Sequence, residues 1–184
     1  MKNKSLKILF IFNGIFVFAS NLLGPLYAVY VGMLNKNLFA ISATWAVGLL
    51  ATSIFTFAVS KKGDLLKEKE YLLLAGFLIR AIAWFLYIGI GNIFQLVLLQ
   101  ILLGLGEAAG SPAFNAIFAE HLDFGKQIKE YSQWMVFSNL LTAAGTVAGG
   151  FVASMFGFHW LFICMGTLAL VSFFGILVQP RKLL

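Results

Sequence analysis

Residues 93–118 read IFQLVLLQILLGLGEAAGSPAFNAIF, a continuous apolar stretch in which Glu107 is the single charged residue. An α-helix rises 1.5 Å per residue, so about 20 apolar residues cross the ~30 Å hydrocarbon core of a bilayer. This stretch is therefore long enough to span a membrane. A charge at the centre of a bilayer costs about 2.5 to 3.5 kcal/mol, so Glu107 needs a partner, a path to water or a function.

The whole chain has the composition of an integral membrane protein. Of its 184 residues, 61% are hydrophobic and 11% are charged, and the mean hydropathy is +0.94. Six stretches are long enough to span a bilayer: Ile8–Val31, Phe39–Val59, Tyr71–Ile90, Ile93–Phe118, Met135–Phe156 and Trp160–Val178. They lack the alternation of a membrane β-barrel. The sequence therefore predicts an all-α membrane protein with a single six-helix transmembrane domain over residues 1–184.

The basic residues of the loops lie almost entirely on one side of the predicted membrane. They precede the first span, follow the sixth, and occupy the loops after the second and fourth: Lys2, Lys4, Lys7, Lys61, Lys62, Lys67, Lys69, Lys126, Lys129, Arg181 and Lys182. The opposite loops contain only Lys36. Short loops rich in Lys and Arg stay in the cytoplasm, so both termini are predicted to be cytoplasmic. This bias accounts for the net charge of +6 without a nucleic-acid partner.

The sequence contains no pattern typical of an enzyme or a metal site. The single cysteine, Cys164, excludes an internal disulfide, and His121 and His159 are far apart. There is no H-E-x-x-H motif, no G-x-S-x-G motif and no pair of acids inside a span. We therefore expect neither enzymatic activity nor a cofactor. The first span has a basic start but no A-x-A cleavage pattern, so we expect it to be retained rather than removed as a signal peptide.

Glycines are spaced along the fourth and fifth spans so that these helices can approach their neighbours closely. The residues expected to serve helix packing or gating are Gly104, Gly106, Pro112, Gly145, Gly149 and Gly150. Proline lacks a backbone N–H, so Pro25 and Pro112 are expected to bend or interrupt the first and fourth spans.

Two charged residues inside neighbouring spans lie at similar predicted depths. Arg80 is about 13 Å from the start of the third span, and Glu107 is about 21 Å from the start of the fourth, which runs the other way. In a ~30 Å core the two depths differ by only about 4 Å, which predicts an ion pair. One interpretation is that the two charges only neutralise each other. Another is that Glu107 carries protons for coupled transport or provides a counter-charge for the solute. A third possibility is that Glu107 reaches the cytoplasmic loop between the second and third spans.

Uncharged polar side chains recur at helical spacing on three spans and mark one candidate face. Together with the two charged residues, the predicted substrate or coupling pathway consists of Asn13, Asn21, Arg80, Gln100, Glu107, Asn115, Ser138 and Thr142. For each neutral residue, the alternative is a hydrogen bond between helices. Aromatic residues near the predicted ends of the spans are expected to anchor the protein at the membrane surfaces: Tyr27, Tyr30, Tyr71, Trp84, Tyr87, Tyr131 and Trp160.

Three stretches resemble the major facilitator superfamily. QILLGLGEAAGSPAFNAIFAE, residues 100–120, is similar to the fourth helix of that family, with Gln100 at the place of an arginine. SNLLTAAGTVAGGFVASMFGFHWLF, residues 138–162, resembles the fifth helix and the turn that follows it, with Thr146 in place of a proline. SKKGDLLKEKEYLLLAG, residues 60–76, is similar to the loop between helices 2 and 3, of which Asp64 and the basic Lys69 are retained.

The resemblance implies a fold and a function for the chain. Members of the family have two six-helix halves related by an axis along the membrane normal, and this chain resembles the N-terminal half. That implies a half-size transporter in the cytoplasmic membrane if the source is prokaryotic. It is expected to move a small solute by alternating access as a parallel homodimer or with a second half-size chain, and coupling, where present, is expected to use protons. Two alternatives remain open: a non-transporting subunit docked on another transporter half, and the substrate-binding membrane subunit of an ATPase-driven importer.

Overall fold

The computed structural model describes residues 4–63 and 68–179. Within these residues the chain forms helices and no strand: α1 (Lys4–Asn21), α2 (Leu26–Leu34), α3 (Leu38–Gly63), α4 (Glu70–Leu86), the 3₁₀ turn η1 (Tyr87–Gly89), α5 (Ile93–Glu120), α6 (Gln127–Phe156) and α7 (Phe158–Leu177). Among the described residues, five helices are long and apolar enough to cross a membrane. The pair α1 and α2, bent by 44°, makes a sixth span if it is counted as one. The predicted all-α membrane fold is confirmed.

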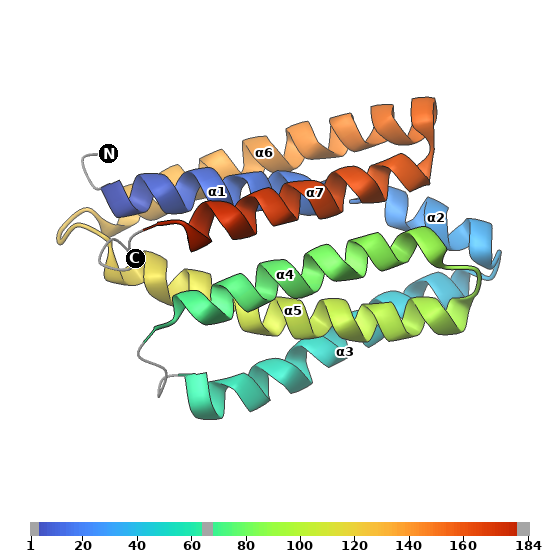
Figure 1. The fold of residues 1–184 in the computed structure, drawn as a ribbon, viewed down its shortest axis with the longest axis horizontal. Helices are drawn as coiled ribbons and strands as arrows, with labels where there is room; N and C mark the ends of the chain where they lie inside the picture. The colour runs from blue at the N-terminus through green and yellow to red at the C-terminus, as the bar shows by residue number, and fades with distance from the viewer. Residues whose placement is uncertain (1–3, 64–67, 180–184) are drawn as a thin grey trace.

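The helices form two groups of three. In one group α1 packs along α6 and α7, and in the other α5 packs along α3 and α4 (Figure 1). Contact between α4 and α7 joins the groups, and α2 adds a smaller contact with α3. The start of α1 and the end of α7 lie at the same end of the bundle, as an even number of crossings requires (Figure 1). Which side of the membrane this end faces stays a prediction.

The first span is broken where the sequence predicts a bend. Gly24 has a positive φ of +27°, a conformation that L side chains rarely adopt, and Pro25 caps the start of α2. Pro112 behaves differently, because α5 runs through it from Ile93 to Glu120. The fourth span is therefore not interrupted at Pro112, and the alternative expectation of a bend there stays a prediction. Proline is tolerated in membrane helices where the local structure satisfies the freed carbonyl.

One predicted boundary differs clearly from the structure. The fifth span was expected to begin at Met135, whereas α6 begins at Gln127, about two turns earlier. The additional turns are polar and contain Glu130, whose carboxylate accepts a hydrogen bond from the backbone N–H of Asp123 at 2.9 Å. An acid in the first turn also interacts favourably with the helix dipole. Hydropathy identifies only the apolar part of a helix, so it misses polar turns at a helix end.

Three of the predicted packing glycines lie at close helix contacts. A Cβ on Gly104 would lie 2.8 Å from the backbone nitrogen of Thr52 on α3, and one on Gly145 would lie 2.7 Å from the carbonyl oxygen of Phe18 on α1. A Cβ on Gly149 would collide with the backbone of Leu22. Gly150 is different, because nothing among the described residues lies within 4 Å of its Cβ position. Gly150 therefore packs against no described residue of this bundle, and its expected role in packing or gating stays a prediction.

Four of the expected membrane anchors belong to the core instead. Tyr27, Tyr30, Trp84 and Tyr87 are all buried, with Tyr87 only 1% exposed. Tyr30 donates a hydrogen bond from its hydroxyl to the carbonyl oxygen of Tyr87 at 3.1 Å, and its ring packs against those of Tyr87, Phe158 and Phe162. The anchor prediction is wrong here because depth along a span does not decide which side of the helix faces lipid.

The other three aromatic residues lie on the surface of the bundle, where an anchor must lie. Trp160, Tyr71 and Tyr131 are all exposed. Their role at the membrane surfaces stays a prediction.

Candidate functional site

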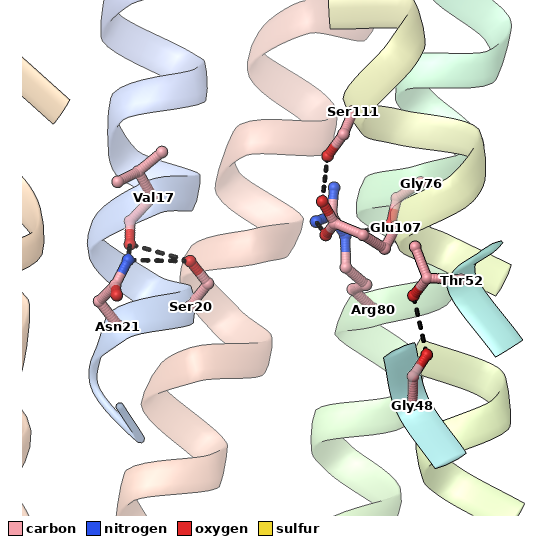
Figure 2. Close-up of polar contacts among 9 residues, drawn as sticks. All are labelled: Val17, Ser20, Asn21, Gly48, Thr52, Gly76, Arg80, Glu107 and Ser111. Carbon is pink, nitrogen blue, oxygen red and sulfur yellow. Dashed lines mark hydrogen bonds and ion pairs between the residues drawn. The ribbon is translucent and has the colours of Figure 1, made fainter. Parts of the chain in front are cut away.

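An ion pair between α4 and α5 lies at the centre of the candidate site. A terminal nitrogen of Arg80 contacts Glu107 Oε2, and Ser111 donates a hydrogen bond from its hydroxyl to Glu107 Oε1. Figure 2 shows this group on α4 and α5 at the right, with Ser20 and Asn21 on α1 at the left of the view. The predicted pairing of Arg80 with Glu107 is confirmed. The agreement arises because residues at similar depths on adjacent, antiparallel helices can come into contact.

The side chain of Arg80 is held on several sides. Its Nε donates to the carbonyl oxygen of Gly76 at 3.1 Å, one turn earlier on α4. Its guanidinium carbon lies 4.0 Å from the ring centroid of Phe16 on α1, a cation–π contact. Arg80 is 8% exposed, whereas the side chain of Glu107 is 44% exposed. The arginine is therefore fixed inside the bundle, and the carboxylate is the accessible member of the pair.

Three glycines make room for this arginine. A Cβ on Gly106 would lie 2.7 Å from Arg80 Cγ, and a Cβ on Gly110 would lie 2.6 Å from Arg80 Nη2. A Cβ on Gly76 would lie 2.5 Å from the Cα of Gly110, so the backbones of α4 and α5 touch here. Gly106 is thus a packing residue as predicted. Gly76 was not predicted, although its spacing of four residues before Arg80 places it on the same helix face.

Two cavities border the ion pair. The aromatic cavity, of about 280 Å³, has the rings of Tyr27, Trp45 and Trp84 in its wall, and the polar cavity, of about 330 Å³, has the side chains of Asn13 and Thr142. Both cavities share three lining residues, namely Ser20, Arg80 and Glu107. The charged pair therefore lies at the boundary between a largely apolar space and a largely polar one.

The structure brings the predicted pathway residues together around these cavities. The aromatic cavity is lined by Asn21 and Gln100, the polar cavity by Asn13, Asn115, Ser138 and Thr142, and both by Arg80 and Glu107. These residues come from four helices, α1, α4, α5 and α6, and converge on one region. Their contact with a solute stays a proposal.

A hydrogen-bonded chain crosses the wall of the aromatic cavity. Gln100 on α5 donates from Nε2 to the hydroxyl of Tyr27 on α2 at 2.5 Å, and Tyr27 donates to Thr44 Oγ1 on α3 at 2.9 Å. Gly48 lies beside this chain, since a Cβ there would be 2.8 Å from Gln100 Oε1. The chain connects the short helix α2 to both α3 and α5.

The contribution of α3 to the site was not predicted from the sequence. Thr44, Gly48 and Thr52 recur every four residues, which places them on one face of α3. This spacing is the signal that identifies the face in retrospect. The repeat was hidden because a hydroxyl or a glycine barely lowers the hydropathy of an otherwise apolar helix.

One polar atom in the wall of the aromatic cavity lacks a partner. Tyr87 lines this cavity, and its buried hydroxyl makes no hydrogen bond to any described residue. An unsatisfied buried hydroxyl costs about 1 to 3 kcal/mol. Its neighbour Tyr30 has a satisfied hydroxyl, so the two tyrosines form a natural comparison.

An aromatic cluster adjoins the polar cavity. Trp134 on α6 has its ring centroid 5.1 Å from that of Phe10 on α1 and 5.0 Å from that of Phe114 on α5. Phe118 extends the cluster along α5 and contacts Phe10 and Tyr131. The cluster packs α1, α5 and α6 against one another, and Phe114 and Trp134 also line the polar cavity.

The predicted cytoplasmic motif loop is only partly described. Asp64 lies outside the described residues. Lys69, just before α4, forms an ion pair with Glu120 at the end of α5. This pair joins α4 and α5 at the end of the bundle that also holds the start of α1. A gating role for Lys69 stays a prediction.

No group of three or more metal-ligating side chains occurs among the described residues. Among the described residues the site consists of an ion pair, neutral polar groups and aromatic rings, all carried by apolar helices. Ionisable and polar side chains inside a helical membrane bundle are typical of proteins that move solutes or ions across membranes.

The sequence matches the model of the Major Facilitator Superfamily over residues 9–183, so the chain belongs to this family of transporters. It is accordingly an integral, multi-pass membrane protein, and its bacterial relatives indicate the inner membrane.

Three relatives show how similar the chain is to known proteins and how much of each protein it covers. The chain is 28% identical to the multi-drug resistance efflux pump PmrA of Streptococcus pneumoniae over 179 residues, which are 96% of this chain and 45% of that protein. It is 28% identical to the chloramphenicol resistance protein CraA of Acinetobacter baumannii over 166 residues, 83% of this chain and 40% of that protein. It therefore spans about half the length of these two relatives. A third relative, the uncharacterized MFS-type transporter YitZ of Bacillus subtilis, is 23% identical over 84% of this chain and 94% of its own length.

Proposed function

We propose that this chain forms one six-helix bundle of a secondary transporter that exports a small solute by alternating access. The observation that carries the proposal is the Arg80–Glu107 ion pair, which borders both cavities. Polar residues of α1 and α5 line both cavities, and those of α6 line the polar cavity. In related transporters the site lies near the bilayer midplane between two repeated bundles, which rock about it. Export is proposed because two relatives are named for drug efflux or drug resistance.

The proposed partner is a second six-helix bundle in parallel orientation, either a second copy of this chain or a different half-size chain. Parallel orientation is proposed because the loop lysines lie on one side, whereas an antiparallel pair needs nearly balanced loops. The outer faces of α3 and α6 carry large exposed apolar side chains, such as Phe57 and Phe151, that suit contact with lipid or with another bundle. Chemical crosslinking in membranes and a detergent-corrected mass test this assembly, and antiparallel pairs alone would contradict it.

Proton coupling is proposed to act through Glu107. This carboxylate is accessible, lines both cavities and is bound to Arg80 and Ser111, so a proton on it changes two contacts in one step. Among the described residues that line the cavities it is the one acid.

Flux measurements in liposomes test the proposal. The purified chain is reconstituted, and uptake of radiolabelled chloramphenicol is followed with and without a pH gradient. We expect a gradient to accelerate transport, and we expect Glu107→Gln to remove that acceleration while the protein still inserts and folds. The matched control is Glu120→Gln, which removes an acid at the end of the same helix, outside both cavities. Equal acceleration in the Glu107→Gln variant would eliminate proton coupling through this residue.

The two alternative functions give different results in this assay. A non-transporting subunit gives no flux by itself and gains activity only with another transporter half. The membrane subunit of an ATPase-driven importer requires ATP and co-purifies with an ATPase. Membership of the Major Facilitator Superfamily favours secondary transport over both.

A further inference from the structure

We propose that the solute bound by this bundle is uncharged and combines an aromatic or other flat apolar group with neutral hydrogen-bonding groups. The inference rests on the proposed transport function and specifies the chemical class of the solute. It follows from the charge balance of the two cavities and from the different character of their walls.

The described residues that line the two cavities have a net charge of zero. Of the described residues that line the two cavities, only Arg80 and Glu107 are charged, and they neutralise each other. Both carboxylate oxygens of Glu107 are engaged, one by Arg80 and one by Ser111. Arg80 is further bound through Nε to Gly76 and through its flat face to Phe16.

A charged solute therefore finds no uncompensated opposite charge here. A cation has to compete with Arg80 for Glu107, and an anion has to compete with Glu107 for Arg80. Gly106, Gly110 and the ring of Phe16 hold Arg80 in place. Moving this arginine aside for a cation therefore also disrupts packing. A neutral solute leaves the pair intact. Moving an unpaired ion into an apolar environment is strongly unfavourable, whereas a neutral amphiphile avoids that penalty.

The walls of the cavities favour a solute with two kinds of surface. The aromatic cavity presents the rings of Tyr27, Trp45 and Trp84, with Leu49 and Met165 among its aliphatic residues. Flat apolar groups pack well against such rings. Its volume of about 280 Å³ is near the lower end of ligand pockets, which suits one or two fused rings.

The polar cavity supplies neutral hydrogen-bonding groups. Its wall contains the amides of Asn13 and Asn115 and the hydroxyls of Ser138 and Thr142. Amides both donate and accept, and hydroxyls do the same, so these groups match alcohols, amides and carbonyls rather than ions. A solute that lies across the boundary between the cavities places its ring on one side and its polar groups on the other.

The test uses three probes that share one ring system and differ in charge: 1-naphthalenemethanol, 1-naphthylmethylammonium and 1-naphthoate. Binding to the whole chain in nanodiscs of zwitterionic lipid is measured by equilibrium dialysis at neutral pH. Empty nanodiscs provide the correction for partition into lipid. We expect the alcohol to bind at least about tenfold more tightly than either ion, since an ion here must give up solvation or break the pair.

Charge variants make the result specific to the ion pair. Arg80→Gln leaves the Glu107 carboxylate without its cation and is expected to shift the preference to the ammonium probe. Glu107→Gln leaves Arg80 without its anion and is expected to shift the preference to naphthoate. The double variant contains neither charge and is expected to restore the preference for the alcohol. It also serves as the folding control, because it buries no uncompensated ion, and each variant is compared after its helicity and monodispersity are checked.

The outcomes separate this inference from the proposed function. Wild-type protein that binds an ion as tightly as the alcohol, or that binds none of the probes, overturns the inference. An unchanged preference in a folded Arg80→Gln variant also overturns it. If chloramphenicol flux persists in those cases, the transport function stands and only the solute class is wrong. If the predicted preferences hold but no flux occurs, the solute class stands and the transport function is wrong.

Discussion

Gly110 on α5 lies directly against the guanidinium of Arg80 on α4, since a Cβ at this glycine would be 2.6 Å from Arg80 Nη2. Arg80 in turn contacts Glu107, one turn before Gly110 on the same helix. The position of the central charge thus depends on the absence of one methyl group. Small residues in membrane helices are usually explained by helix approach alone. Here the glycines of α5 also provide the space for a buried charged side chain.

We predict that Gly110→Ala lowers the stability of the bundle by about 1 to 3 kcal/mol, the usual cost of overpacking a well-packed interior. The reason is that the new methyl group displaces the guanidinium or separates α4 from α5. Thermal unfolding in detergent measures the change. The matched control is Gly150→Ala, in a helix interior where nothing described lies within 4 Å of the added carbon. That variant is expected to be neutral or more stable by up to about 1 kcal/mol, because alanine favours helix. Equal losses of stability in the two variants would contradict the idea that Gly110 makes room for Arg80.

We predict that Tyr87→Phe leaves the stability unchanged or raises it by about 1 kcal/mol, because it removes a buried hydroxyl that has no described partner. Tyr30→Phe is the matched control. It removes a hydroxyl that donates to the Tyr87 carbonyl at 3.1 Å, so it is expected to cost about 1 kcal/mol. Both rings keep their aromatic contacts. Unfolding of the two variants under identical conditions distinguishes these outcomes, and a larger loss for Tyr87→Phe than for Tyr30→Phe would show that the Tyr87 hydroxyl has a partner.

We predict that Tyr27→Phe loosens α2 from the rest of the bundle. The substitution removes the bonds to Gln100 and Thr44, which connect α2 to α5 and α3, at a cost of about 1 to 3 kcal/mol. Hydrogen exchange measured by mass spectrometry is expected to accelerate in α2 more than in α7. The control is Tyr131→Phe, which alters a more exposed tyrosine on α6. Unchanged exchange in α2 after Tyr27→Phe would mean that packing alone holds this helix.

We predict that the loop between α2 and α3 faces outward and that the start of α6 faces the cytoplasm. In a Cys164→Ser background, a cysteine at position 36 is expected to react with a membrane-impermeant thiol reagent in intact cells. A cysteine at position 129 is expected to react only after permeabilisation. Lys36 and Lys129 are both exposed, so accessibility does not differ between them for structural reasons. The reverse pattern would invert the topology derived from the loop charges.

Several features of the fold follow from the sequence directly. The number and approximate limits of the spans come from hydropathy, because a bilayer requires a minimum apolar length whatever the packing. The break in the first span comes from Gly24 and Pro25, whose backbone preferences act locally. The ion pair follows from the constant rise of a helix, which converts sequence position into depth.

Other features depended on which way each helix is rotated. The burial of Tyr87 and the open surroundings of Gly150 concern the direction of a helix face, and an apolar span shows almost the same hydropathy on every side. The same limit hid the contribution of Thr44 and Gly48 on α3.

By itself, the sequence determined that this protein is a bundle of membrane helices with a charged pair at one depth and polar residues on three of its spans. Only the tertiary structure decided that these residues surround two adjoining cavities, that glycines leave room for Arg80, and that α2 is tied to α3 and α5 through Tyr27. The physical reason is that lipid and protein interior are both apolar. Hydrophobicity places a helix in the membrane, but close packing, hydrogen bonds and charge pairing set its rotation against its neighbours.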